Sequence, residues 1–147
     1  MHNHFTSVAV LGAGVIGASW SALFACAGLR VKVYDPMADA EQKVRSYLAD
    51  AAPMLQQLGM QGPQGEISFH TSAKEAVKDC QFVQECAPEK LHIKHQLYAD
   101  IEAHLLPDAI VASSASGLMV SEMQAGWSNP SRFILGHPFN PPHLIPL

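Results

Sequence analysis

The side chain best suited to transferring a proton near neutral pH is His137, within the run LGHPFNPP at 135–142. An unperturbed imidazole has a pKa of about 6.5, so it can act as a general base or acid close to neutrality. Ser116, in the run ASSASGL at 112–118, offers a hydroxyl group, although a serine after a strand also forms local turns. Both residues follow stretches typical of strands, and open α/β sheets bind ligands at the carboxyl ends of their strands. We therefore expect Ser116 and His137 at the ligand-binding edge of a sheet.

Other histidines lack this setting and are expected to be exposed or to form ordinary hydrogen bonds: His70, His92, His95 and His104. His92 and His95 share one face of a predicted helix. No acidic or cysteine partner lies beside them at the spacing of a zinc site. No metal site is therefore expected.

A glycine-rich run follows the first predicted strand and opens the first predicted helix. Its residues are Gly12, Ala13, Gly14, Val15, Ile16 and Gly17. In a GxGxxG turn the first glycine permits the tight turn, the second lets the backbone approach a pyrophosphate, and the third lets the helix lie close to the strand. The helix N-terminus then offers free N–H groups and a positive dipole end to the phosphates. The strand-turn-helix context predicts a dinucleotide site.

Asp35 is expected to bind the adenosine ribose of that dinucleotide. It ends the second predicted strand at about the 20-residue spacing at which a carboxylate accepts hydrogen bonds from ribose. An Asp-Pro pair also opens turns, which is the alternative interpretation. Pro36 and Met37 follow in place of an arginine, so no cation awaits a 2′-phosphate. The sequence favours NAD over NADP.

The elements that must position these residues alternate between strand and helix. Strands are expected at 7–11, 31–34, 67–70, 82–87, 109–113 and 133–136, and helices at 15–27, 38–58, 73–78, 89–105 and 119–125. This order predicts a doubly wound α/β fold with a parallel sheet, that is, a Rossmann fold. Gly28 is expected to stop the first helix, and Pro53 to break or re-initiate the second.

Composition narrows the range of partners. The 147 residues are 48% hydrophobic and 15% charged, with a formal net charge of −4 and no run of Lys or Arg. Nucleic acid and anionic membrane surfaces are therefore not expected partners. No apolar stretch approaches the roughly 20 residues of a membrane span, and no signal peptide is recognised. Three isolated cysteines, Cys26, Cys80 and Cys86, are expected to be buried free thiols in a reducing cytoplasm.

The runs at 112–118 and 135–142 strongly resemble motifs of the L-3-hydroxyacyl-CoA dehydrogenase superfamily, and the resemblance extends from the first strand to the last residue. Within that superfamily they are most similar to the branch of L-carnitine dehydrogenase and L-gulonate 3-dehydrogenase. The resemblance implies an NAD-dependent enzyme that oxidises a small-molecule 3-hydroxy compound to its 3-keto form.

The resemblance also implies roles for individual residues. His137 matches the catalytic histidine, and Ser116 matches the serine that binds the substrate oxygen. Asn140 matches the asparagine near nicotinamide and substrate, so Ser116 and Asn140 also border the cofactor. Glu89 and Lys94 match cofactor-contacting residues. From the residues alone, Glu89 could instead complement a helix dipole, and Lys94 could be a solvated helix charge.

The sequence departs from the acyl-CoA members of the family in its second helix. Those members carry polar or basic residues there, whereas this sequence has Ala51, Ala52, Leu55 and Leu58, followed by a short connection at 59–65. A carnitine-like or sugar-acid substrate is therefore favoured over an acyl-CoA thioester.

In the family the chain continues into a Val-Glu pair, whose glutamate orients the catalytic histidine, and then into a helical domain. That domain closes the substrate site and forms the dimer. We therefore expect residues 1–147 to be the NAD-binding domain of a longer homodimeric enzyme. Two alternatives stay open: a non-catalytic or structural NAD-binding relative, and a dehydrogenase of the 3-hydroxyisobutyrate type. The latter uses a catalytic lysine, and no lysine follows Lys94 in this sequence.

Overall fold

The computed structural model describes residues 5–60 and 65–145, and it confirms the expected doubly wound fold. The strands are β1 (Ser7–Leu11), β2 (Arg30–Tyr34), β3 (Ile67–His70), β4 (Phe82–Glu85), β5 (Ile110–Ser113) and β6 (Phe133–Leu135). The helices are α1 (Val15–Cys26), α2 (Ala40–Gln57), α3 (Ala73–Val77), α4 (Leu91–Ile101) and α5 (Val120–Gln124), with 3-10 turns at Glu102–His104 and Pro130–Arg132. All strand pairs are parallel, in the order β3-β2-β1-β4-β5-β6, so β1 and β4 flank the point at which the chain changes direction.

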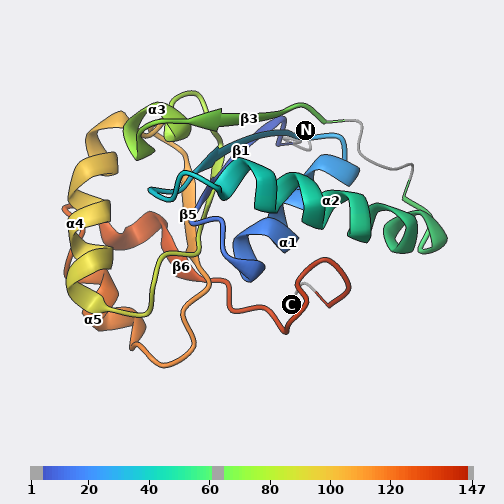
Figure 1. The fold of residues 1–147 in the computed structure, drawn as a ribbon. Coiled ribbons are helices and arrows are strands. Elements are labelled where there is room, and N and C mark those ends of the chain that lie inside the picture. The colour runs from blue at the N-terminus through green and yellow to red at the C-terminus, as the bar shows by residue number, and fades with distance from the viewer. Residues whose placement is uncertain (1–4, 61–64, 146–147) are drawn as a thin grey trace.

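Helices cover both faces of the sheet because alternate strand residues point to opposite sides. Val8 and Val10 of β1 pack with residues of α1 and α2, whereas Ala9 and Leu11 pack with residues of α3, α4 and α5. Figure 1 shows α1 and α2 to one side of the strands and α4 and α5 to the other. Burial on both faces explains the nearly continuous apolar sequence of β1, whereas β2 alternates the buried Val31 and Val33 with less buried charged residues.

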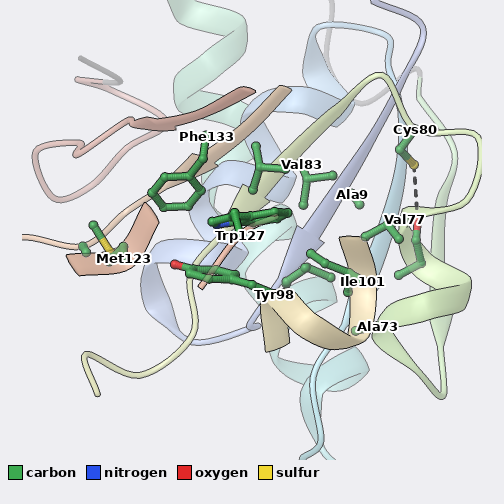
Figure 2. Packing of buried hydrophobic residues seen from close by; sticks show 14 residues of the cluster. Ala9, Ala73, Val77, Cys80, Val83, Tyr98, Ile101, Met123, Trp127 and Phe133 are labelled. Atoms are coloured by element: carbon green, nitrogen blue, oxygen red, sulfur yellow. Dashed lines mark hydrogen bonds between the residues drawn. The ribbon is translucent and has the colours of Figure 1, made fainter. Parts of the chain in front are cut away.

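An aromatic cluster holds α4 against the far end of the sheet (Figure 2). The Tyr98 ring stacks on Trp127 at a centroid distance of 4.8 Å and lies 5.2 Å from the Phe133 ring of β6. Cys80 closes the other end of the same core, where its thiol donates to the Ala76 carbonyl. The cluster fixes the helix that follows β4 relative to the strand that precedes His137.

The prediction that Pro53 interrupts the second helix is wrong. Helix α2 continues from Ala40 to Gln57 with Pro53 inside it. Pro53 and Ala49, whose carbonyl the missing N–H would have bonded, are both exposed, so water can solvate that carbonyl. Ala51 and Leu55 are buried against α1 and keep the helix in place. Gly28 does end α1, with a φ of +82°.

The connection expected at 59–65 lies partly outside the described residues. Among the residues that are described, no helix is both long and apolar enough to cross a membrane.

Candidate functional site

Two glycines of the Gly12–Gly17 loop are required by close backbone contacts. Gly12 has a φ of +102°, and a Cβ there would lie 2.5 Å from the Cys86 carbonyl oxygen. A Cβ on Gly17 would lie 1.8 Å from the Gly12 carbonyl oxygen. The loop therefore lies in close contact with the segment that follows β4 and with the first turn of α1. These are the close contacts expected of the first and third glycines of the motif.

The middle glycine faces open space. Gly14 is the N-cap of α1, and a Cβ there would meet no atom within 4 Å. The N–H groups of Val15, Ile16 and Gly17 belong to the first turn, where a helix has no internal acceptors for them. The first turn contains no acidic residue. This end of α1 thus combines free donors, a positive dipole end and room for an anion, so it fits a dinucleotide pyrophosphate.

Asp35 ties the loop to the end of β2. Its Oδ2 accepts the Ala13 N–H at 2.7 Å, and its Oδ1 accepts the Met37 N–H at 2.8 Å. The bond to Met37 agrees with the turn-opening interpretation of Asp35, while ribose binding stays a prediction. The half-buried carboxylate borders a cleft, where its remaining lone pairs can accept hydrogen bonds from a ribose.

The cleft has a volume of about 870 Å³ and lies between the glycine loop and α4. Its floor includes Gly12, Gly14 and Asp35, and its apolar walls include Met37, Ile93 and Leu97. Ligand pockets typically measure roughly 300–1,000 Å³ and combine apolar walls with few polar groups. The size and walls suit a nucleoside whose base lies between Met37 and α4 and whose ribose meets Asp35.

Glu89 does not begin the helix that follows β4. Helix α4 begins at Leu91 with Lys90 as its N-cap, so the helix-dipole interpretation of Glu89 is wrong. Its carboxylate instead accepts the Ser116 N–H at 2.7 Å, the Ser116 hydroxyl at 3.0 Å and the Gly117 N–H. The Gly117 N–H, together with the N–H and hydroxyl of Ser116, holds the pKa of Glu89 below its ordinary value. An ionised Glu89 therefore orients the loop that carries Ser116.

Lys94 is buried, so its interpretation as a solvated helix charge is wrong. Its side chain is 1% exposed, and its Nζ lies 2.6 Å from Glu85 Oε1 and 3.1 Å from the Ala87 carbonyl. The second Glu85 oxygen accepts the hydroxyls of Tyr98 at 2.9 Å and Ser113 at 2.6 Å. Burial, followed by the charge of Glu85, raises the pKa of Tyr98.

This buried network was missed from the sequence. It joins the ends of β4 and β5, because Glu85 ends one strand and Ser113 ends the other. Glu85 also accepts the Ala87 N–H at 2.7 Å, so the cleft-lining loop after β4 is held from inside. The available signal was a charged residue, Glu85, at the end of a strand whose last three residues are buried.

His137 and Asn140 are exposed side chains on the segment that follows β6. The Gly136 N–H donates to the Ser113 carbonyl at 2.9 Å, so this segment and the Ser116 loop leave the same edge of adjacent strands. None of the hydrogen bonds described within residues 5–60 and 65–145 joins His137 or Asn140 to Ser116. The structure therefore places Ser116 and His137 on segments that leave one edge of the sheet, and it directly connects only Ser116 with Glu89.

Of the histidines and cysteines set aside in the sequence, His92 lines the cleft, whereas His95 and His70 form ordinary hydrogen bonds. His95 Nε2 lies 2.7 Å from the Glu122 carbonyl, and His70 Nε2 lies 3.1 Å from the Ser68 hydroxyl. Cys26 and Cys80 are buried, whereas Cys86 is only half-buried at the cleft. Burial of its thiol raises the pKa of Cys86 to about 12, which disfavours a thiolate nucleophile. In the described part of the chain, no group of three or more potential ligands is placed to hold a metal ion.

Comparison with known proteins gives one consistent family. The sequence matches the family described as 3-hydroxyacyl-CoA dehydrogenase, NAD binding domain, over residues 7–147. It is 46% identical over 146 residues to an L-carnitine dehydrogenase of Pseudomonas sp, covering 98% of this chain and 46% of that protein. The L-carnitine dehydrogenase of Nocardiopsis dassonvillei is 45% identical over 143 residues, which cover 96% of this chain and 44% of the relative.

A solved structure agrees with this relationship. The NAD+-dependent dismutase 5-formyl-3-hydroxy-2-methylpyridine 4-carboxylic acid 5-dehydrogenase superposes with a TM-score of 0.87 at 34% identity, over 97% of this chain and 47% of that chain. The chain spans about half the length of the curated relatives it matches.

Proposed function

The chain belongs to the 3-hydroxyacyl-CoA dehydrogenase family through its NAD-binding domain, and we propose that it oxidises a 3-hydroxy compound to the 3-keto form. The main support for this proposal is that two sets of residues lie at the same edge of the sheet. The NAD cradle of Gly12–Gly17 and Asp35 lies at the ends of β1 and β2, and the loops with Ser116 and His137 follow β5 and β6. A cofactor and a proton-transfer group are thereby presented to the same side of the sheet.

The proposed roles follow from the chemistry of each side chain. Bound NAD supplies the hydride acceptor, and His137 takes the hydroxyl proton as general base. The Ser116 hydroxyl, which donates to Glu89 in this structure, would turn to donate to the substrate oxygen, so that the substrate hydroxyl keeps its single proton for His137. Asn140 borders nicotinamide and substrate. Lys94 acts on the cofactor side by holding the Ala87 carbonyl, since Ala87 lines the cleft.

We propose a carnitine-like or sugar-acid 3-hydroxy substrate ahead of an acyl-CoA thioester. L-carnitine dehydrogenases at 46% and 45% identity support this order. The composition of α2 supports it less than the sequence suggested, because Ala51 and Leu55 are buried and only Ala52 and Leu58 reach the surface. NAD is preferred to NADP because the Asp35 carboxylate would repel a 2′-phosphate.

The rest of the enzyme is also a proposal. We infer a further domain beyond this NAD-binding domain, because the chain covers 46% and 44% of two L-carnitine dehydrogenases, and the family resemblance implies that this domain is helical. A homodimeric enzyme in the cytoplasm is consistent with the family and with the three free cysteines.

A substrate panel on the full-length enzyme tests the proposal. L-carnitine, a sugar acid such as L-gulonate and 3-hydroxybutyryl-CoA are each supplied with NAD, and NADH formation is followed by absorbance. We expect the fastest turnover with one of the two small hydroxy acids. A higher rate with the CoA thioester would overturn the substrate order. Absence of turnover with all three, despite NAD binding, would contradict the proposed activity and favour a non-catalytic NAD-binding protein.

A further inference from the structure

The segment that carries His137 and Asn140 is anchored at both of its ends. At one end the Gly136 N–H donates to the Ser113 carbonyl of β5 at 2.9 Å. At the other end His143 is buried, with 4% of its surface exposed. His137 and Asn140 lie between these two points with exposed side chains. The segment is thus a bridge, defined here as residues 136–143, that presents two polar side chains.

The anchor at His143 is a paired contact with one serine of α1. The His143 N–H donates to the Ser19 Oγ at 2.9 Å, and the His143 Nδ1 lies 2.9 Å from the same oxygen. Because Ser19 Oγ accepts the backbone N–H, its single proton is free to donate to Nδ1. We therefore assign the imidazole the tautomer that carries its proton on Nε2, in which Nδ1 accepts from Ser19. The Tyr47 ring of α2 meets the imidazole edge-on at 5.6 Å and 85°.

One buried atom of the His143 side chain lacks a hydrogen bond to the described residues, which lowers the stability of this contact. His143 Nε2 is buried and has no hydrogen-bond partner among the described residues. A buried donor without a partner costs free energy, and a leucine or alanine would avoid that cost. An apolar side chain would keep the backbone N–H bond to Ser19 but would lose the contacts of Nδ1 with the Ser19 hydroxyl at 2.9 Å and with the Tyr47 hydroxyl at 3.4 Å.

Ser19 connects the bridge to the NAD cradle. It lies two residues after Gly17 on α1, whose N-terminus faces the pyrophosphate position. Pro138, Pro141 and Pro142 restrict the backbone between His137 and the anchor, because proline fixes φ. A shift at His143 would therefore be passed on to His137 and Asn140 instead of being absorbed by the chain.

We propose that Ser19 and His143 are positioning residues that set His137 and Asn140 relative to the nicotinamide end of NAD. This inference rests on the proposed function, since it takes His137 as the general base. Ser19 and His143 themselves touch neither substrate nor cofactor in this assignment. Their loss should lower the rate of the chemical step and leave NAD binding in place.

Ser19→Ala in the full-length enzyme is the decisive variant, with Ser21→Ala as its matched control. Ser21 is equally buried on α1, but its hydroxyl donates to the Gly17 carbonyl at 2.8 Å. We expect Ser19→Ala to lower kcat roughly 10–100-fold, the scale of a small misplacement of a catalytic group, with an unchanged Kd for NAD. Amide hydrogen exchange between Gly136 and Ile145 should become faster in Ser19→Ala and not in Ser21→Ala.

His143 variants supply the rescue test. His143→Ala should lose kcat as Ser19→Ala does, and His143→Asn should restore most of it because a carboxamide oxygen can replace Nδ1 as acceptor. Wild-type kcat in Ser19→Ala, or an equal loss of kcat and NAD affinity, would overturn the positioning role. His137→Gln distinguishes failure of the positioning role from failure of the proposed function. If that variant keeps full turnover, the catalytic role assigned to His137 is wrong, whatever Ser19→Ala shows.

Discussion

The two sides of the sheet edge are built by different means. On the β1–β2 side the NAD cradle is made mainly of backbone, with glycines at positions where a Cβ would lie 2.5 Å or less from a carbonyl oxygen. On the β5–β6 side the proposed chemistry depends on exposed side chains, those of Ser116, His137 and Asn140. The buried network around Glu85 lies between the two sides and ties the ends of β4 and β5.

Because of this difference, we expect mutations on the β1–β2 side to change folding and cofactor binding, and mutations on the β5–β6 side to change catalysis. Gly12 and Gly17 cannot be changed without moving the backbone packed against them, so their mutations should affect stability, whereas mutations at Gly14 should affect NAD binding. Exposed side chains can be replaced without disturbing the core, so their mutations should affect turnover alone. Each of the following substitutions tests that separation.

His137→Gln should give the largest effect on turnover. Loss of a positioned general base lowers the rate by about 10²–10⁴-fold. The affinity for NAD and the stability should stay unchanged, because the imidazole is exposed and assigned to the substrate. Steady-state kinetics of the full-length enzyme, calorimetric titration with NAD and thermal unfolding measure the three quantities. A parallel fall in NAD affinity would show that the two sides are not separable.

Lys94→Met should give the largest loss of stability. It leaves the Glu85 carboxylate buried, with 0% exposure, and without its cation. Breaking a buried ion pair by removing one partner costs about 3–5 kcal/mol. Urea unfolding measures the loss. Lys90→Met is the control, because Lys90 is exposed at the start of the same helix. Equal stability of the two variants would contradict a structural role for the network.

The placement of the glycine motif between the first strand and the first helix was predicted correctly from the sequence. A glycine motif between a strand and a helix, followed by Asp35, reflects local constraints, and local constraints can be read from neighbouring residues. The six strands were likewise recognised from apolar runs, with boundaries within one or two residues. Pro53 was misjudged, because its effect depended on the exposure of Ala49 and on burial of the opposite helix face.

The side-chain network could not be predicted in the same way. Whether Lys94 is solvated or buried depends on where Glu85 lies, and Tyr98 and Ser113 complete the network from different elements. The pairing of Ser19 with His143 spans 124 positions of the sequence. Sequence periodicity and residue spacing do not predict such pairings, because the paired residues come together only when the helices pack on the sheet.

Gly17→Ala and Gly14→Ala should separate stability from binding within the cradle itself. Gly17→Ala forces a Cβ against the Gly12 carbonyl, and overpacking of this kind costs about 1–3 kcal/mol. Gly14→Ala meets no atom within 4 Å, so stability should be retained, but the added methyl group would occupy the place of the pyrophosphate. Urea unfolding measures the stability of both variants, and titration with NAD measures their affinity for the cofactor. Gly14→Ala with wild-type NAD affinity would contradict the cradle.

Asp35 should give a smaller, selective effect on the cofactor side. We expect NAD to bind roughly tenfold or more tightly than NADP, which corresponds to about 1.4 kcal/mol. Asp35→Asn should reduce that preference, because the amide removes the charge that repels a 2′-phosphate and keeps one acceptor for Ala13. Calorimetric titration with both nucleotides measures it. Equal or tighter binding of NADP to the wild-type protein would contradict the assignment.

The smallest expected effect is a pH dependence of stability at the bridge anchor. Burial lowers the pKa of His143, so the folded state favours the neutral imidazole more than the unfolded state does. The unfolded chain then binds more protons below its own pKa of about 6.5, and the free energy of unfolding must fall as the pH decreases through that value.

Above that pH the contribution of His143 is fully present. His143→Asn removes the titrating group and keeps an acceptor for Ser19, so its stability should fall less than that of the wild type between about pH 6.5 and 5. His70, whose pKa burial also lowers, is present in both proteins and cancels in the difference. Urea unfolding at several pH values gives the two slopes. Identical slopes would mean that His143 titrates as it does in the unfolded chain, and then burial on Ser19 would not be the state that holds the bridge in solution.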